Sequence, residues 1–206
     1  MEIPAIYAVL RGGEVRAAPV RIDGMKITFA SEPVRQSHFA EDAEERIPVV
    51  VADMKGFGKG KIDDRLLMKL KFPGNDIWFM SHIEDIEDVF DCFMGEIEKL
   101  LIPYHAVRRM SVLRETFDIS DNCIPVLFAP QGRVKCRGSE TKDIRTVLEE
   151  LEKIGFHEIA VFDSDSVLRP EDWISLRERS EGVIPFIRYR NEELVRAGFK
   201  RIIFDH

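Results

Sequence analysis

Ionisable side chains stand at the ends of several extended apolar segments of this sequence. His82 and His105 each close one such segment, and Asp163 and Asp205 close two others. Imidazole and carboxylate groups are frequent general acids and bases in enzymes, because their pKa values can be brought near neutral pH. We therefore predict acid–base chemistry in which these four residues are catalytic.

A second group of charged residues follows segments of the same kind and is predicted to bind the substrate. Its members are Asp53, Lys55, Asp165 and Arg188. Lys55 and Arg188 would act as charge clamps for a small anionic metabolite. The stretch 53–61 interleaves lysines with glycines and would form a basic loop around such a ligand. An ordinary surface loop is the competing interpretation, because the stretch lacks the spacing of a Walker A motif.

The same histidines and aspartates are also residue types that bind divalent metal ions. No HExxH spacing is present, and the three cysteines, Cys92, Cys123 and Cys136, show no CxxC pair. We therefore expect no metal and no other cofactor. A divalent-metal site built from the same groups remains an alternative hypothesis, besides acid–base catalysis and a non-catalytic role.

Eight extended segments would position these residues. They occupy residues 2–10, 47–53, 76–82, 99–105, 123–131, 158–165, 183–190 and 200–206. Helix-like or loop segments separate them, which predicts βα units and a parallel sheet. Eight units fit a compact (β/α)8 barrel of the TIM type, and an open doubly wound parallel sheet is the alternative. In such a barrel the carboxyl ends of the strands surround one opening, where we expect the site.

The segment between the first two strands differs from the other connections, because its first part lacks a helical pattern. Gly12-Gly13 and Asp23-Gly24 predict an antiparallel hairpin excursion over 11–34. The polar stretch 35–46 then predicts a first helix.

Two later helices have clear apolar stripes. They are predicted over 83–97 and 140–154, with Ser81 as the N-cap of the first and Gly155 as the end of the second. The last strand reaches the C-terminus, so no final helix would cover the groove between strands eight and one. A second subunit or the excursion, taken over residues 11–46, would have to cover it, and we predict a homo-oligomer.

Length and composition indicate one domain over residues 1–206. The chain has 45% hydrophobic and 33% charged residues and a net charge of −7, which argues against a grip on a nucleic-acid backbone. No apolar run approaches the roughly 20 residues that span a bilayer, and the first residues lack the basic region of a signal peptide. We expect a cytoplasmic protein with neither nucleic-acid nor membrane partners.

The order of short motifs resembles the ProFAR (phosphoribosylformimino-AICAR-phosphate) isomerase family, a barrel family of histidine biosynthesis. Residues 3–6 (IPAI) and 12–16 (GGEVR) are similar to that family's opening strand and its "GGKVVR" stretch. Residues 51–56 (VADMKG) are similar to its "vDLdgA" after strand two, and residues 83–89 to the helix after its strand three. Residues 131–134 (QGRV) are similar to its "dGkV" after strand five. The resemblance covers nearly the whole chain and implies the TIM-type barrel.

Departures from the family pattern imply a different reaction. Tyr7 stands where the family has its catalytic base, and Ala129 or Pro130 where it has its acid. The family binds phosphate with glycine-rich turns after strands three, four, seven and eight. This sequence has residues with side chains in place of those glycines. The resemblance therefore implies a divergent barrel, an isomerase or lyase for a small anionic metabolite. The alternative is a non-catalytic ligand-binding or assembly protein on a barrel scaffold.

Overall fold

Eight parallel strands close into a barrel in the computed structural model, which describes residues 1–23, 25–35, 47–70 and 74–205. The strands are β1 (Glu2–Arg11), β6 (Ile47–Asp53), β7 (Asn75–Met80), β8 (Lys99–Pro103), β9 (Cys123–Phe128), β12 (Ile159–Asp163), β13 (Val183–Ile187) and β14 (Ile202–Asp205). Each pairs in parallel with the next, and β14 pairs with β1, with Glu2 opposite Ile202. The predicted TIM-type barrel is confirmed, and the sheet is not the open alternative.

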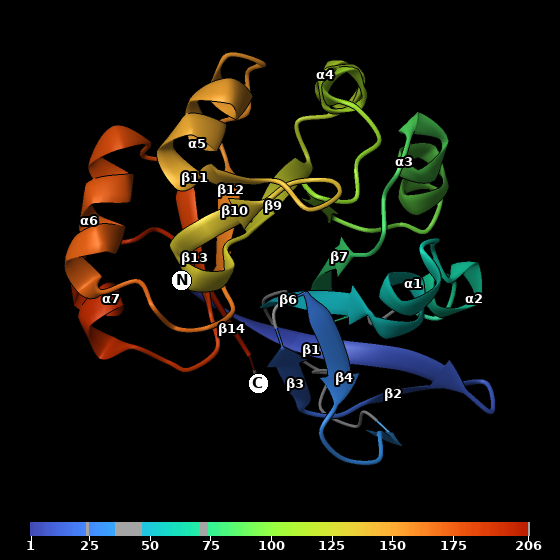
Figure 1. Cartoon of the computed structure of the whole chain (residues 1–206). Helices are drawn as coiled ribbons and strands as arrows, with labels where there is room; N and C mark the ends of the chain where they lie inside the picture. The colour runs from blue at the N-terminus through green and yellow to red at the C-terminus, as the bar shows by residue number, and fades with distance from the viewer. Residues whose placement is uncertain (24, 36–46, 71–73, 206) are drawn as a thin grey trace.

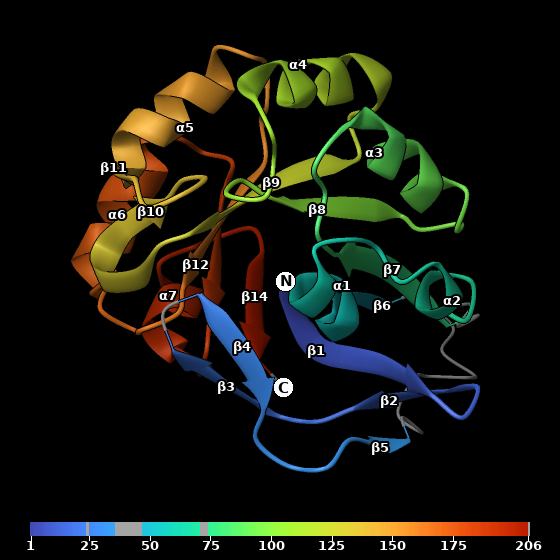
Figure 2. The ribbon, with the colours of Figure 1, turned by 45° about the vertical axis from the view of Figure 1, so that its right-hand side comes forward.

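Helices follow the strands and surround the barrel (Figure 2). They are α1 (Met54–Lys59), α2 (Asp64–Leu67), α3 (Ile86–Phe93), α4 (Met110–Ile119), α5 (Ile144–Glu152), α6 (Pro170–Arg179) and α7 (Glu192–Arg196). A short hairpin of β10 (Arg133–Lys135) and β11 (Thr141–Asp143) lies between the 3-10 turn η1 (Pro130–Gly132) and α5. In the described part of the chain, no helix has the length and apolar character needed to cross a bilayer.

The groove between β14 and β1 has no helix over it among the described residues. Its outward-facing Ile6 and Ile202 are nevertheless buried, and Pro4 and Phe204, which pair across the seam, are half-buried. The homo-oligomer expected from this groove stays a prediction.

Side chains of each barrel strand alternate between two apolar clusters. One set packs against the helices, and the other fills the barrel. The interior set is Ile3, Ala5, Tyr7, Val50, Ala52, Trp78, Met80, Leu101, Ile124, Val126, Phe128, Ala160, Phe162, Ile184, Phe186 and Ile203. The barrel interior is therefore a packed core.

An antiparallel excursion follows β1, as predicted. β2 (Glu14–Ala17) pairs with the end of β1, and β5 (Val34–Arg35) pairs with β2. Between them, β3 (Val20–Asp23) and β4 (Lys26–Phe29) form a separate hairpin that packs on the interior cluster. In Figures 1 and 2 this blue hairpin lies close to the carboxyl end of β14. It covers the carboxyl end of the barrel, called the mouth below.

Of four local predictions, three can be compared with the described residues. The glycine–lysine stretch expected to be a loop forms α1, which starts after Asp53 as N-cap and ends at Gly60 in the left-handed conformation. The capping prediction for Ser81 is wrong, because α3 starts at Ile86 and the Asp88 carboxylate accepts the N–H of Asp85. The end of α5 near Gly155, which has φ of +123°, is confirmed. The helix expected over 35–46 falls, apart from its first residue, outside the described residues.

Candidate functional site

A cavity of about 170 Å³ lies between the β3–β4 hairpin and the mouth of the barrel. Its lining residues are Met25, Lys26, Ile27, Phe57, Gly58, His82, His105 and Phe128. His82 lies two residues beyond the interior residue Met80, and His105 lies four beyond the interior residue Leu101. Both residues lie just beyond the ends of β7 and β8, and both line the cavity. The structure thus brings these two predicted residues together.

His105 is held in its neutral form. Burial, together with the smaller effects of the charges of His82 and Lys135, lowers the pKa of its imidazole to about 4. Its ring packs edge-on against Phe128 with centroids 4.9 Å apart, and its Nδ1 is buried without a hydrogen-bond partner among the described residues. A neutral imidazole has one unprotonated nitrogen, which can accept a proton.

His82 is half-buried and faces the same cavity. Its Nε2 lies 3.8 Å from the position that a Cβ at Gly60 would occupy. Within the described ranges its ring forms no hydrogen bond to the protein, and no carboxylate lines the cavity. Two imidazoles are therefore available to a ligand, without a competing negative charge beside them.

Asp205 and Arg188 meet Tyr7 in a second polar cluster of the mouth. The Tyr7 hydroxyl donates to Asp205 Oδ1 at 2.6 Å, and Arg188 Nε lies 3.6 Å from Asp205 Oδ2. Burial raises the pKa of Asp205 to about 6, although the Tyr7 hydrogen bond and the Arg188 charge act in the opposite direction. None of the three residues lines the cavity.

The two clusters lie on different sides of the barrel. Tyr7, Arg188 and Asp205 come from β1, β13 and β14 or the loops after them, across the strand order from β7 and β8. A row of aromatic rings runs from β9 through β12 to β13. Their centroids are 5.1 Å apart for Phe128 and Phe162 and 4.3 Å apart for Phe162 and Phe186. Asp205 therefore shares the mouth with the imidazoles but not their cavity.

Asp53 does not face the mouth. Val50 and Ala52 belong to the interior cluster, so Asp53 points toward the helices. Its carboxylate accepts hydrogen bonds from the backbone N–H groups of Gly56 and Asp63 and from the Ser81 hydroxyl, each at 2.8 Å. Burial raises its pKa, and these hydrogen bonds oppose the rise. The placement differs from the predicted rim position and gives Asp53 the geometry of a structural carboxylate.

Lys55 is also outside the cavity. Its ammonium group forms an ion pair with Asp63 Oδ1 at 2.8 Å, and the Asp63 side chain is 3% exposed. A lysine held by a buried carboxylate is a poor clamp for a free anion, because ligand binding would leave that carboxylate unpaired.

Asp163 points away from the mouth for the same reason as Asp53. Ala160 and Phe162 face the interior, so Asp163 faces the helices, where it accepts the N–H groups of Val167 at 3.1 Å and Leu168 at 2.9 Å. Its neighbour Asp165 is exposed and accepts the N–H of Gln131 at 3.2 Å. The structure therefore places neither aspartate at the cavity.

Replacing Asp163 with asparagine is expected to lower the free energy of unfolding by about 1–3 kcal/mol. An amide offers one acceptor oxygen, so one of the N–H groups of Val167 and Leu168 would lose its partner. Urea denaturation measures the change. The matched control is Asp165→Asn, whose exposed site predicts a change within about 0.5 kcal/mol. Equal effects for the two variants would contradict the structural role of Asp163.

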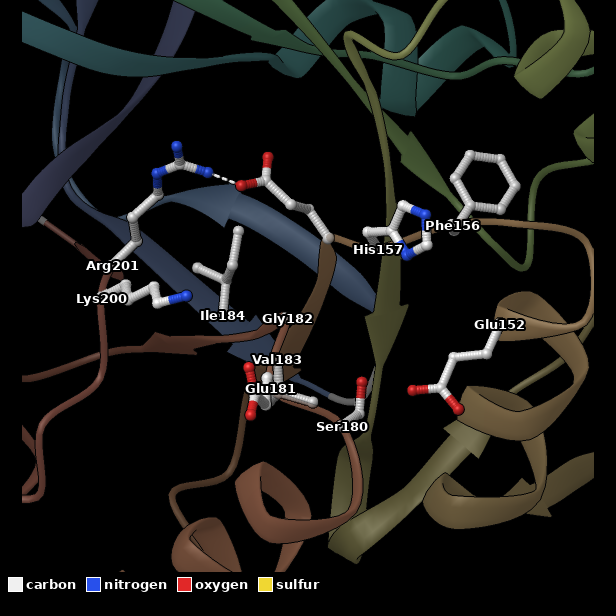
Figure 3. Close-up of a pocket in the computed structure, with 11 residues that line it drawn as sticks. Glu152, Phe156, His157, Ser180, Glu181, Gly182, Val183, Ile184, Lys200 and Arg201 are labelled. Carbon is white, nitrogen blue, oxygen red and sulfur yellow. Dashed lines mark ion pairs between the residues drawn. The ribbon is translucent and has the colours of Figure 1, made fainter.

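A larger cavity of about 760 Å³ lies at the opposite end of the barrel (Figure 3). The Arg201 guanidinium forms an ion pair with Glu158. In Figure 3 His157 and Glu152 lie on the other side of the pocket from Arg201. Glu158 also pairs with Lys99 at 2.7 Å, and Lys99 and Arg201 stack over the ring of Trp78, 5.4 and 5.6 Å from its centroid.

The ion-paired arrangement closes the amino end of the barrel. Trp78 is 3% exposed and fills this end, and the Glu158 carboxylate pairs with both cations that stack over its ring. In barrels of this type the amino end contributes stability, whereas chemistry takes place at the carboxyl end. The smaller cavity at the mouth is therefore the better candidate site.

Several residues that line the mouth cavity are not among the site residues predicted from the sequence. Met25 and Ile27 arrive from the hairpin, Phe57 from α1, and Phe128 from the end of β9. The inward direction of Phe128 could have been predicted from the sequence, since Ile124, Val126 and Phe128 are spaced two residues apart and lie on one face of their strand. The three described cysteines are buried and free, and no three His, Cys, Asp or Glu side chains converge as metal ligands among the described residues.

The sequence matches no protein-family model, and no curated protein is significantly similar to it. A TIM-type barrel hosts many unrelated functions, so the fold does not identify the reaction. The function has to be argued from the residues at the mouth.

Proposed function

We propose that the protein acts on a small anionic metabolite by proton transfer between His82 and His105 in the mouth cavity, as an isomerase or a lyase does. The observation that carries this proposal is that His82 and His105 line one small cavity, and that His105 Nδ1 has no hydrogen-bond partner among the described residues. In the proposed reaction, His105 takes a proton from a carbon of the substrate. His82 donates a hydrogen bond or a proton to the oxygen on which negative charge develops.

The walls of the cavity support this chemistry. Phe57, Phe128 and Ile27 exclude water, which strengthens hydrogen bonds between a bound ligand and the imidazoles. A carboxylate ligand would meet imidazole N–H donors and no lining carboxylate. The cavity is below the roughly 300 Å³ at which pockets for drug-sized ligands begin, which favours a molecule of a few heavy atoms.

We also propose that the protein is related to the ProFAR isomerases but does not catalyse their reaction. The closed barrel agrees with it. Tyr7, at the place of the family's base, is bound to Asp205, and Ala129, at the place of its acid, is buried. A two-phosphate substrate also exceeds the cavity. We propose a divergent, cytoplasmic relative that uses different residues at the same mouth.

Hydrogen–deuterium exchange into a small keto acid tests the proposed proton transfer. Pyruvate and 2-oxobutyrate are suitable probes, because their C3 hydrogens exchange when a C3 proton is removed to form the enol or enolate, a step that a general base accelerates. We expect the wild-type protein to accelerate exchange in D2O, followed by proton NMR, and His105→Ala and His82→Ala to reduce it to the buffer rate. His157→Ala is the control, because His157 is exposed at the opposite end of the barrel. Equal exchange with His105→Ala and wild type would contradict the assignment.

A second candidate function is non-catalytic binding of the same kind of ligand. The aromatic row that fills the mouth favours it, because it leaves little room for a substrate to change shape. Ligand-induced thermal shifts with the keto acids, lost in His105→Ala but without deuterium exchange in the wild type, would support binding over catalysis.

A further inference from the structure

The β3–β4 hairpin has one apolar and one polar face. Val20 is buried, and Ile22, Ile27 and Phe29 are half-buried against the barrel interior. The alternate residues Arg21, Asp23, Lys26 and Thr28 are exposed. The hairpin therefore covers the mouth with its apolar face toward the barrel, and this face forms the roof of the cavity.

The hairpin is independent of the barrel in its backbone hydrogen bonding. β3 and β4 pair with each other in a sheet of two strands, and the N–H of Ala30 donates to the Pro19 carbonyl at 2.8 Å across their base. Among the described residues, no ladder hydrogen bond joins the hairpin to a barrel strand. It can move as a unit about its two ends without breaking a sheet.

A single side chain connects the hairpin to the barrel by a polar contact in the described ranges. Arg188, after β13, donates from its guanidinium to the Val20 carbonyl at 3.3 Å. The same guanidinium lies 3.6 Å from the Asp205 carboxylate, which in turn accepts the Tyr7 hydroxyl. The ring of Tyr189 lies 5.6 Å from the guanidinium carbon. Asp205, Tyr7 and Tyr189 thus hold Arg188 in the orientation that reaches the hairpin.

We propose that the β3–β4 hairpin is a lid over the mouth cavity and that the hydrogen bond from Arg188 to the Val20 carbonyl holds it closed. This hydrogen bond is called the latch below. Closure places Met25 and Ile27 over His82 and His105, and opening breaks the hydrogen bond from Arg188 to Val20 and exposes both imidazoles. Arg188 is then a positioning residue of the lid and does not clamp the substrate. The inference concerns the cavity used in the proposed function, but it does not require that function to be correct.

Carbethoxylation of histidine by diethyl pyrocarbonate tests the lid without a ligand. The reagent acylates neutral imidazoles that it can reach, and mass spectrometry gives the rate at each histidine. We expect slow labelling of His105 in the wild type and labelling about tenfold faster in Arg188→Met, because one charge-assisted hydrogen bond no longer opposes opening. Labelling of the exposed His157 is expected to be the same in both proteins.

Two further variants isolate the latch. Arg190→Met removes a neighbouring, exposed arginine that pairs with Glu2 and is expected to leave His105 labelling unchanged. Arg188→Lys retains a donor and is expected to give an intermediate rate. Unchanged labelling in Arg188→Met, or acceleration of equal size in Arg190→Met, overturns the latch.

A wild-type measurement keeps the lid testable if Arg188→Met fails to fold. Labelling of His105 is measured at increasing urea concentrations below the unfolding transition. A lid predicts a rate nearly independent of urea, because little surface is exposed on opening. A rate that rises with the full slope of global unfolding overturns the lid. Neither result depends on deuterium exchange into a keto acid, so failure of the lid and failure of the proposed chemistry are distinguishable.

Discussion

Gly56→Ala is expected to destabilise the protein by about 3–5 kcal/mol, because a methyl group has no room at this position. A Cβ at Gly56 would lie 2.3 Å from Asp53 Oδ2 and 2.3 Å from Ser81 Oγ. These two atoms are joined by a 2.8 Å hydrogen bond, and both residues are completely buried. The alanine would have to separate them or displace α1, and either change leaves buried polar groups without partners.

Gly58→Ala is the matched control for that prediction. Gly58 lies in the same short helix, but no atom lies within 4 Å of a Cβ placed there. Alanine is a better helix former than glycine, so this variant is expected to gain up to about 1 kcal/mol. Urea denaturation of both variants measures the difference. Comparable stability of the two would show that the contact of Asp53 with Ser81 does not depend on close approach of α1.

His105 is expected to make stability depend on pH with a known sign. Its pKa is lowered from 6.5 to about 4 in the folded protein. The unfolded chain therefore binds a proton near pH 6.5, whereas the native state resists protonation until about pH 4. Its contribution is fully present above pH 6.5 and is lost as the pH falls toward 4. The loss amounts to about 3 kcal/mol.

Asp205 acts in the opposite direction over nearly the same range. Its pKa is raised from 3.8 to about 6, so the native state holds a proton that the unfolded chain releases. Its contribution to stability is full below pH 3.8 and is lost as the pH rises through 6. The two contributions offset each other in the wild type, and each becomes visible only when the other is removed.

Urea denaturation at pH 7 and pH 4.5 separates the two groups. His105→Gln is expected to lose less stability on acidification than the wild type, and Asp205→Asn is expected to lose more. His157→Gln, at an exposed site, is expected to follow the wild type. The same pH dependence in His105→Gln and wild type would contradict the buried, neutral state of His105.

The sequence by itself determined the set of barrel strands and the end at which polar groups collect. Extended apolar segments alternated with helical patterns, and parallel strands in a barrel must end on one side. For this reason the locations of His82 and His105 could be predicted without coordinates. The direction of each side chain was harder to predict. In β12, IAVFD, all five residues are buried, so no polar alternation indicates which set faces inward. The sequence therefore predicts Asp163 in the mouth, although it faces the helices.

Only the tertiary structure decided which of these groups share a cavity. The hairpin of 20–29 covers the mouth because its apolar face needs a surface to bury, and the nearest one is the open end of the barrel. Packing of Phe128, Phe162 and Phe186 then separates Asp205 from His105. These contacts join residues far apart in the chain. They depend on the closure of β14 onto β1, and no local pattern of residues encodes the distance between two strand ends across a closed barrel.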